Sequence, residues 1–178
     1  MDAAHFVWGT GFLTCLWCFT RMFVRTSSGR KRHNVLGAYN AITRKLVTVV
    51  NDSYINSTSV CEMLRLLRKT HASGAIKIVL DNAAYQRCAL VQNLARELNI
   101  TLLYLPAYSP NLNLIERLWK FVKKQSLNNC YYETFEDFKA GISGCLKNIN
   151  VNRQYKSQVA SLMTLRFQIL KNDQILAG

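Results

Sequence analysis

Two acidic residues stand where a carboxylate could take part in chemistry. The first, Asp81, directly follows the apolar run from Ala75 to Leu80, which is typical of a strand buried on both faces. A carboxylate at that point is costly unless it is solvated, hydrogen-bonded or bound to a cation. The alternative is an aspartate that caps the next turn, and position alone does not separate the two interpretations.

The second acidic residue, Glu116, lies near the start of a predicted helix. The segment from Asn113 to Glu116 has the capping-box pattern, which is a purely structural explanation for this glutamate. At about 100° per residue, however, the helix places Glu116 beside its own apolar stripe, near Lys120 and Lys123, where it could border a cleft. If this helix packs against the sheet, Asp81 and Glu116 would offer hard oxygen ligands for magnesium or manganese. Two such ions, about 3.5–4 Å apart, could promote phosphoryl transfer.

The sequence around these acids resembles a known family. Leu80-Asp81-Asn82-Ala83 and the stretch 105–119, with its Pro106-Ala107-Tyr108-Ser109-Pro110 loop and Trp119, resemble the insertion-sequence branch of the Tc/mariner superfamily of DDE transposases. Thirty-four residues separate Asp81 from Glu116, which is the spacing associated with that superfamily. The segment 1–7 resembles the strand motif that carries the first catalytic aspartate of the family, here Asp2.

This resemblance implies a specific activity and a specific site. It implies a ribonuclease H-like fold that binds two divalent ions, magnesium or manganese, cuts transposon ends and joins the freed 3′-hydroxyl to target DNA. Asp2, Asp81 and Glu116 would be the catalytic and metal-binding residues, with Asp2 on the middle strand of the sheet. The implied partners are transposon-end and target DNA, and a second copy of the chain in a synaptic homodimer. Tyr108, Ser109 and Pro110 would shape the loop that positions the last core helix.

The chain departs from the family pattern at two places. Many relatives carry a histidine shortly after the second aspartate, whereas this chain has Tyr85-Gln86-Arg87, so no histidine is assigned a catalytic role. We expect His5 and His33 to be satisfied surface or core residues. Relatives also carry a helix-turn-helix domain and apolar residues ahead of the first aspartate, so the first strand is expected to be truncated. The alternatives to a transposase are therefore a non-catalytic DNA-binding or oligomerising remnant, and another ribonuclease H-like nuclease that cuts hybrids or junctions.

The elements that must position these residues follow from the hydrophobic periodicity. Strands are predicted at 2–8, 34–41, 45–50, 75–80 and 100–105, with a hairpin across 43–44 and an exposed loop at 25–32. Helices are predicted from Ser59, through a Ser59–Glu62 capping box, to about Arg68, then over 90–98 and 113–124, and from 135 to 145 after a Thr134 cap. This order predicts an α/β fold with a mixed central sheet covered by helices on both faces. Residues 1–150 would form the catalytic domain, and 151–178 a C-terminal extension packed on it or trailing from it.

The composition agrees with a globular DNA-binding protein. The chain has 178 residues, 49% of them hydrophobic, which argues against disorder over most of its length. Its formal net charge of +13 favours a polyanionic partner, either nucleic acid or an anionic membrane surface. The predicted phosphate contacts are Arg25, Arg30, Lys31 and Arg32 in one loop, and Arg117, Lys120 and Lys124 on the last core helix. The alternative for either set is a solvated face.

The cysteines and the N-terminal segment indicate an intracellular protein. Of the six cysteines, only Cys15 and Cys18 have metal-like spacing, and one pair is half a zinc site. Reduced, buried cysteines are the expectation. The apolar run 6–24 is interrupted by glycines, Thr10 and Arg21, and no basic segment precedes it, so neither a spanning helix nor a signal peptide is predicted. We therefore expect a cytoplasmic protein, associated with the nucleoid if the source is bacterial.

Overall fold

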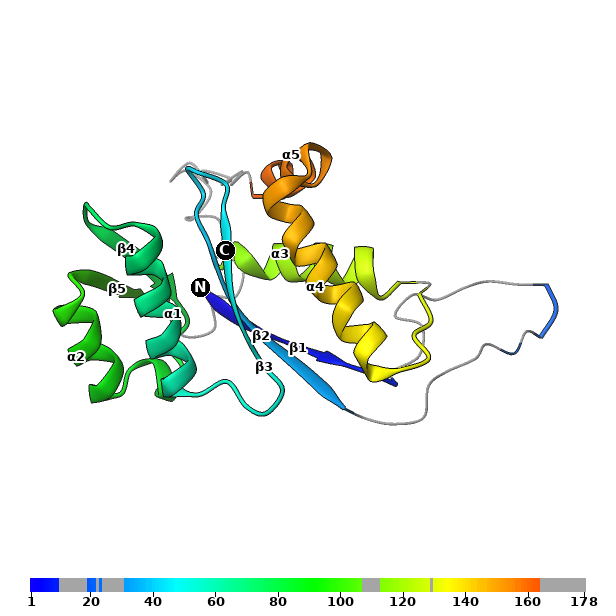
Figure 1. Cartoon of the computed structure of the whole chain (residues 1–178), viewed down its shortest axis with the longest axis horizontal. Coiled ribbons are helices and arrows are strands. Elements are labelled where there is room, and N and C mark those ends of the chain that lie inside the picture. The colour runs from blue at the N-terminus through cyan, green and yellow to red at the C-terminus, as the bar shows by residue number, and fades with distance from the viewer. Residues whose placement is uncertain (10–18, 22, 24–30, 107–112, 129, 164–178) are drawn as a thin grey trace, which may run out of the picture.

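The structure is a computed structural model that describes residues 1–9, 19–21, 23, 31–106, 113–128 and 130–163. Its strands and helices follow one another in the order that the periodicity predicts, and a further helix comes at the C-terminal end (Figure 1). They are β1 (Asp2–Val7), β2 (Arg32–Tyr39), β3 (Leu46–Asn51), α1 (Ser57–Thr70), β4 (Ile76–Leu80), the 3₁₀ turn η1 (Ala84–Gln86), α2 (Ala89–Glu97), β5 (Ile100–Tyr104), α3 (Ile115–Ser126), α4 (Phe135–Val151) and α5 (Arg153–Leu162).

The strands form two sheets, one antiparallel and one parallel, which meet at the beginning of β1. β1, β2 and β3 pair antiparallel in that order, with Asp2 opposite Gly37. β4 and β5 pair in parallel. The amino group of Met1 donates a hydrogen bond of 2.6 Å to the Val79 carbonyl oxygen, which brings the first residues of β1 against β4. The residue after β4 is Asp81, so this junction brings the two predicted aspartates into the same region.

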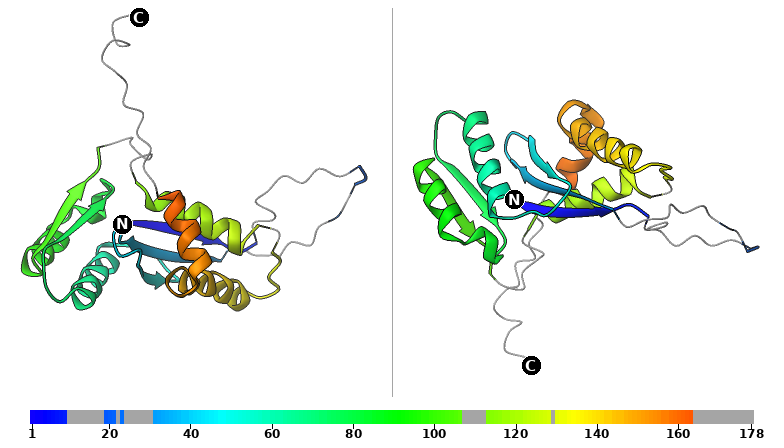
Figure 2. Two further views of the ribbon diagram at one scale, coloured as in Figure 1. Left: turned by 90° about the horizontal axis from the view of Figure 1, so that it is seen from above. Right: turned by 60° about the horizontal axis from the view of Figure 1, so that its bottom comes forward.

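Helices cover the two faces of the strands, and each face has its own core. α3, α4 and α5 pack over one face of the antiparallel part, around Phe6, Val35 and Leu46. α1 and α2 pack on the opposite side with β4 and β5, around Leu36 and other buried residues of those elements. Because Val35 and Leu36 are neighbours in β2, their side chains necessarily point to opposite faces. The views in Figure 2 show the two groups of helices on either side of the strands.

Several local predictions are wrong in detail. The strand β4 is not buried on both faces, because Lys77 and Val79 are exposed on the face that α2 does not cover. β2 begins at Arg32, inside the segment predicted as a loop. The cap of α1 is Asn56, whose side chain accepts a hydrogen bond from the Ser59 backbone N–H, so Ser59 occupies the third helical position and is not the cap.

The C-terminal part is more regular than the sequence indicated. α4 begins after a Thr134 cap, as predicted, and continues to Val151. α5 follows, with Asn152 as its cap, and buries Val159 completely against α3 and α4. Residues 164–178, which complete the predicted extension, lie outside the described part of the chain, as do Tyr108, Ser109 and Pro110.

The described cysteines are free thiols, as predicted, although not all are buried. Cys61 and Cys145 are buried, Cys88 is half-buried and Cys130 is exposed. Burial raises the pKa of the Cys61 and Cys145 thiols. Cys15 and Cys18 fall outside the described residues. No helix in the described ranges is long and apolar enough to cross a membrane.

Candidate active site

Asp2 lies at the start of β1 with its carboxyl group turned toward α3. Its Oδ2 accepts a hydrogen bond of 3.1 Å from the indole Nε1 of Trp119. Burial, helped by the negative charge of the Asp81 carboxylate, raises the pKa of the Asp2 carboxyl from 3.8 to about 6. The Ala3 backbone N–H, the Met1 amino group and the Trp119 indole act in the opposite direction. Asp2 is therefore a half-buried acid beside a second negative charge.

Asp81 is held by the segment that precedes α3. Its Oδ1 accepts a hydrogen bond of 2.8 Å from the side-chain amide of Asn113, a residue only 4% exposed. The following turn, η1, has Ala83 at its N-cap and no side-chain capping bond, so Asp81 does not cap it. The side chain is therefore available for another role.

Two further groups lie close enough to both aspartates to be affected by their charge. Burial lowers the pKa of the Met1 amino group to about 6, while Asp2 and Asp81 act to raise it. Burial also raises the pKa of the Tyr85 phenol, and both aspartates add to that increase. The two carboxylates thus converge where β1 meets β4.

Glu116 occupies the first turn of α3 and is half-buried. The predicted capping box is wrong, because Leu114 is the N-cap of this helix and no side chain caps it. Across the described ranges, no group of three or more His, Cys, Asp or Glu side chains is arranged to hold a metal ion. The structure therefore brings Asp2 and Asp81 together but does not place Glu116 with them in a three-acid cluster.

The position of Glu116 along α3 is nevertheless informative. Glu116 lies three residues before Trp119, which contacts Asp2, and three after Asn113, which precedes the helix and contacts Asp81. Residues three apart on a helix lie on neighbouring positions of one side. Within α3, Glu116 therefore lies on the same side as Trp119, whose indole faces Asp2.

The chemistry of the aspartate pair fits a divalent cation. Magnesium and manganese prefer carboxylate oxygens, and an ionised carboxylate accepts about four hydrogen or coordination bonds. Each aspartate therefore keeps free capacity beyond its bond from Trp119 or Asn113. A cation between the two carboxylates would also oppose the burial and the repulsion that raise the pKa of Asp2.

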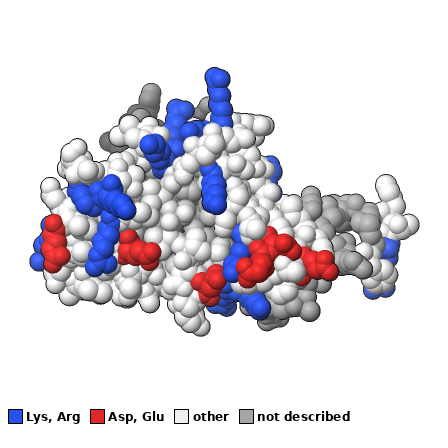
Figure 3. Space-filling view, viewed as in Figure 1, with Lys and Arg blue, Asp and Glu red and all other residues white. Residues whose placement is uncertain are grey.

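The predicted DNA contacts are placed only in part. Arg25 and Arg30 lie outside the described residues, whereas Lys31 and Arg32 are exposed where β2 begins. Lys120 and Lys124 are exposed on α3. Arg117 is half-buried and donates a hydrogen bond of 2.9 Å to the Leu162 carbonyl oxygen, so it joins α3 to α5. Figure 3 shows acidic side chains over the start of α4 and basic side chains near the β2–β3 turn and α5.

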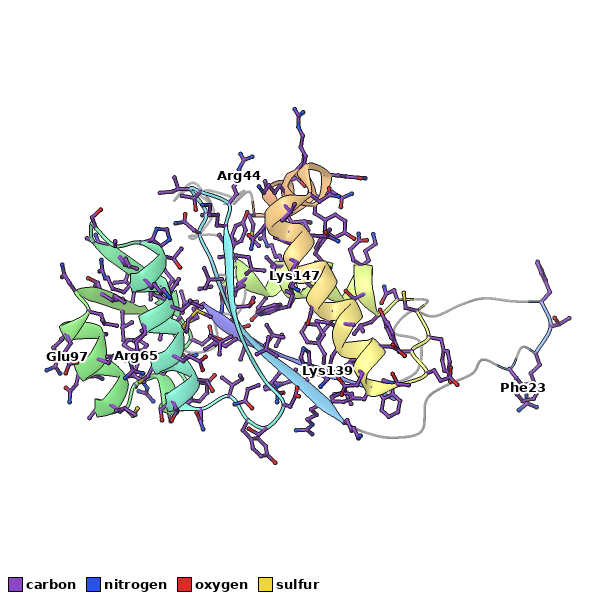
Figure 4. All side chains as sticks on the ribbon, in the orientation of Figure 1. Phe23, Arg44, Arg65, Glu97, Lys139 and Lys147 are labelled. Atoms are coloured by element: carbon purple, nitrogen blue, oxygen red, sulfur yellow. The ribbon has the colours of Figure 1, made fainter. Side chains whose placement is uncertain are left out.

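His5 and His33 have local partners other than Asp2 and Asp81. His5 Nδ1 lies 2.6 Å from the side-chain oxygen of Asn34, and His33 Nδ1 lies 3.0 Å from Asp52 Oδ1. Lys139 of α4, labelled in Figure 4, contacts the other oxygen of Asp52 at 3.2 Å. These contacts join β2, the end of β3 and α4, which agrees with a structural role, although the buried Nε2 of His33 has no hydrogen-bond partner among the described residues.

Three residues of the site were missed as functional residues by the sequence reasoning. The sequence predicted Trp119 as part of an apolar stripe and Asn113 as part of a helix cap, and it gave no role to Gly37. One signal was present, because a buried tryptophan usually finds an acceptor for its indole N–H. The regular three-residue spacing of Asn113, Glu116 and Trp119 was another.

Comparison with known proteins identifies the family. A model of the DDE superfamily endonuclease family matches residues 20–139, which is well over half of the chain. The chain belongs to this family. The matched part of the chain contains Asp81, Glu116 and the two donors Asn113 and Trp119, while Asp2 lies before it. A curated relative, the uncharacterized protein y4pE/y4sA of Sinorhizobium fredii, is 29% identical over 85 residues, which are 47% of this chain and 61% of the relative.

Solved structures confirm the fold of the chain. The Mos1 strand transfer complex is similar with a TM-score of 0.61 and 14% identity, over 93% of this chain and 54% of that one. The catalytic domain of Mos1 mariner transposase gives a TM-score of 0.54 at 14% identity, over 77% of each chain. The fold is therefore ribonuclease H-like, as the sequence predicted. The chain spans about half the length of the complete transposase chains that it matches.

Proposed function

We propose that this chain is the catalytic domain of a DNA transposase, and that it cleaves DNA strands and transfers them with divalent cations held by Asp2, Asp81 and Glu116. The observation that carries the proposal is the convergence of Asp2 and Asp81, each hydrogen-bonded to the segment that bears Glu116. Membership of the DDE superfamily endonuclease family supports the same activity.

The residues of the chain have distinct duties in this reaction. Asp2, at the start of β1, and Asp81, directly after β4, would hold the cations, and Glu116 would supply the third carboxylate from α3. Two divalent cations, magnesium or manganese, would supply activation of the attacking oxygen and stabilisation of the leaving oxygen. Solved structures of the Mos1 catalytic domain are described with Mg and with Mn, which supports this choice of metal.

DNA is the proposed substrate, and the basic residues are its proposed contacts. Lys31, Arg32, Lys120 and Lys124 are exposed, although the Lys31 Nζ lies over the Phe135 ring, 5.5 Å from its centroid. The net charge of +13 favours the approach of a polyanion. Mos1 structures are described as paired-end and strand transfer complexes, so we propose that two copies of this chain act together on transposon ends and target DNA. A bacterial source would place this activity with the nucleoid in the cytoplasm.

The domain division is also a proposal. Residues 1–150 would carry the catalytic domain, and the extension from 151 would add α5. The complete burial of Val159 supports a packed rather than a trailing start of that extension.

Nicking of supercoiled plasmid and of labelled transposon-end DNA, with and without magnesium, tests the proposed activity. The wild-type chain should nick DNA only with the metal, and Asp81→Asn and Glu116→Gln should abolish nicking. Glu97→Gln is the matched control, because Glu97 is exposed at the end of α2, just before β5 begins, whereas Asp81 follows the other end of the parallel strand β4 (Figure 4). DNA binding without any metal-dependent nicking by the wild type would contradict the proposal and favour a non-catalytic protein. Preferential cutting of hybrids or junctions would favour another ribonuclease H-like nuclease.

A further inference from the structure

We propose that Asn113 and Trp119 are positioning residues that fix the carboxylates of Asp81 and Asp2 for metal binding, with Gly37 providing the space for the Trp119 indole. This inference rests on the proposed function, since it assigns a task to residues around the same site. The two donors come from one short segment, and each serves a different aspartate.

The Trp119 indole is fixed from three directions. The residue is 5% exposed, and its ring meets that of Phe6 edge to face at a centroid distance of 6.3 Å. Its Nε1 donates to Asp2. Gly37, opposite Asp2 in the neighbouring strand, lies directly beneath the ring, because a Cβ at position 37 would stand 2.6 Å from Cη2 and 2.8 Å from Cζ2 of Trp119. Any residue with a Cβ at position 37 would therefore displace the Trp119 ring.

Asn113 serves Asp81 in the same way from the other end of the segment. Its side chain is buried, and its amide nitrogen donates to Asp81 Oδ1 across 32 positions of sequence. Its backbone carbonyl oxygen also accepts a hydrogen bond of 3.2 Å from the Glu116 N–H. Asn113 therefore links the second aspartate directly to the first turn of α3, where the third proposed ligand is located.

The geometry has a clear physical consequence for metal binding. A carboxylate that is already held in one orientation loses less side-chain entropy when it takes up a cation. Partners that orient metal ligands typically change metal affinity or activity by about 10–100-fold when they are removed. A purely structural tryptophan, by contrast, would affect folding stability without a specific effect on metal affinity.

Isothermal titration of the chain with manganese alone, without DNA, separates these two roles. Trp119→Phe keeps an aromatic ring but removes the N–H donor. Trp8→Phe is the matched control, because the Nε1 of Trp8 also donates a hydrogen bond, of 3.2 Å, to the Tyr132 carbonyl oxygen in the same core. We expect Trp119→Phe to weaken manganese binding about 10-fold or more. Trp8→Phe should lower the melting temperature but leave manganese affinity unchanged.

Two further variants keep the test decisive if Trp119→Phe does not fold. Gly37→Ala should displace the indole without altering any ligand or donor, and Asn113→Ala should remove the donor to Asp81. Both should weaken manganese binding to a similar degree. Wild-type affinity in all folded variants would overturn the positioning role while leaving the proposed function intact. Absence of manganese binding by the wild type would overturn both. If the variants bind manganese more weakly but the wild type never nicks DNA, the positioning role stands and the proposed function fails.

Discussion

Replacing Asp2 with asparagine should stabilise the metal-free protein, and the gain should depend on pH. Burial, together with the Asp81 carboxylate, raises the pKa of Asp2 from 3.8 to about 6. Below the ordinary value the carboxyl is protonated in both the folded and the unfolded chain, and its contribution to stability is fully present. As the pH rises through about 6, the folded protein must ionise this buried group, and that contribution is lost. Asparagine never ionises, so it avoids this loss.

The size of the effect follows from the two pKa values. The difference between 3.8 and about 6, at about 1.36 kcal/mol per pH unit, corresponds to about 3 kcal/mol of unfolding free energy. For a chain of this length that is a rise of roughly 6–12 °C in melting temperature. The full difference should be present at about pH 8 and should vanish below about pH 3.

Urea unfolding of the wild type and Asp2→Asn, in a chelator and across this pH range, measures the difference. The Met1 amino group, whose pKa burial lowers to about 6, also titrates here, and because the Asp2 carboxylate acts to raise that pKa, the amino group should titrate at a lower pH in Asp2→Asn. Magnesium should then stabilise the wild type and not Asp2→Asn, because only the wild type can pair the cation with an Asp2 carboxylate. A gain of equal size at every pH, or no gain, would refute the assignment of Asp2 as a buried carboxylate facing Asp81.

Three further predictions concern the fold and the DNA contacts. Asn56→Ala should lower the unfolding free energy by about 1 kcal/mol, because it removes the cap of α1. Glu62→Ala should lower it much less. The reverse order in urea unfolding would mean that Ser59 and Glu62 cap the helix instead. Leu103→Lys should change stability by no more than about 0.5 kcal/mol, because Leu103 is 44% exposed, and a loss of several kcal/mol would show that this face is covered. Lys120→Gln and Lys124→Gln should each lower the salt dependence of DNA binding by about 0.9 in the log–log slope, and unchanged slopes would exclude phosphate contacts there.

The sequence was sufficient to locate most strands and helices because hydrophobic periodicity reports which face of an element is buried. The runs that became β1 and α4 are examples, and Thr134 was correctly identified as a cap. Asn56 was missed because Asn56, Ser57, Thr58 and Ser59 are all capable caps, and only the backbone conformation decides between them. The exposed face of β4 was missed because an apolar run does not reveal whether a helix covers it.

The sequence was sufficient to name the acidic residues of the site but not the side chains that contact them. Asp81 could be placed at the end of a strand, yet its bond to Asn113 joins residues 32 positions apart, and Trp119 meets Asp2 across 117 positions. Local patterns favour the nearest explanation, here a helix cap for Asn113 and an apolar stripe for Trp119. Contacts at such separations depend on how the elements pack, which the order of elements does not determine.

Anomalous diffraction from crystals soaked in manganese tests the central claim most directly, because it locates the ion and its ligands together. The account predicts manganese between the carboxylates of Asp2 and Asp81, with Glu116 turned from α3 to complete the site. Manganese bound elsewhere, or bound at the aspartates with the Glu116 carboxylate directed away, would contradict the three-carboxylate centre.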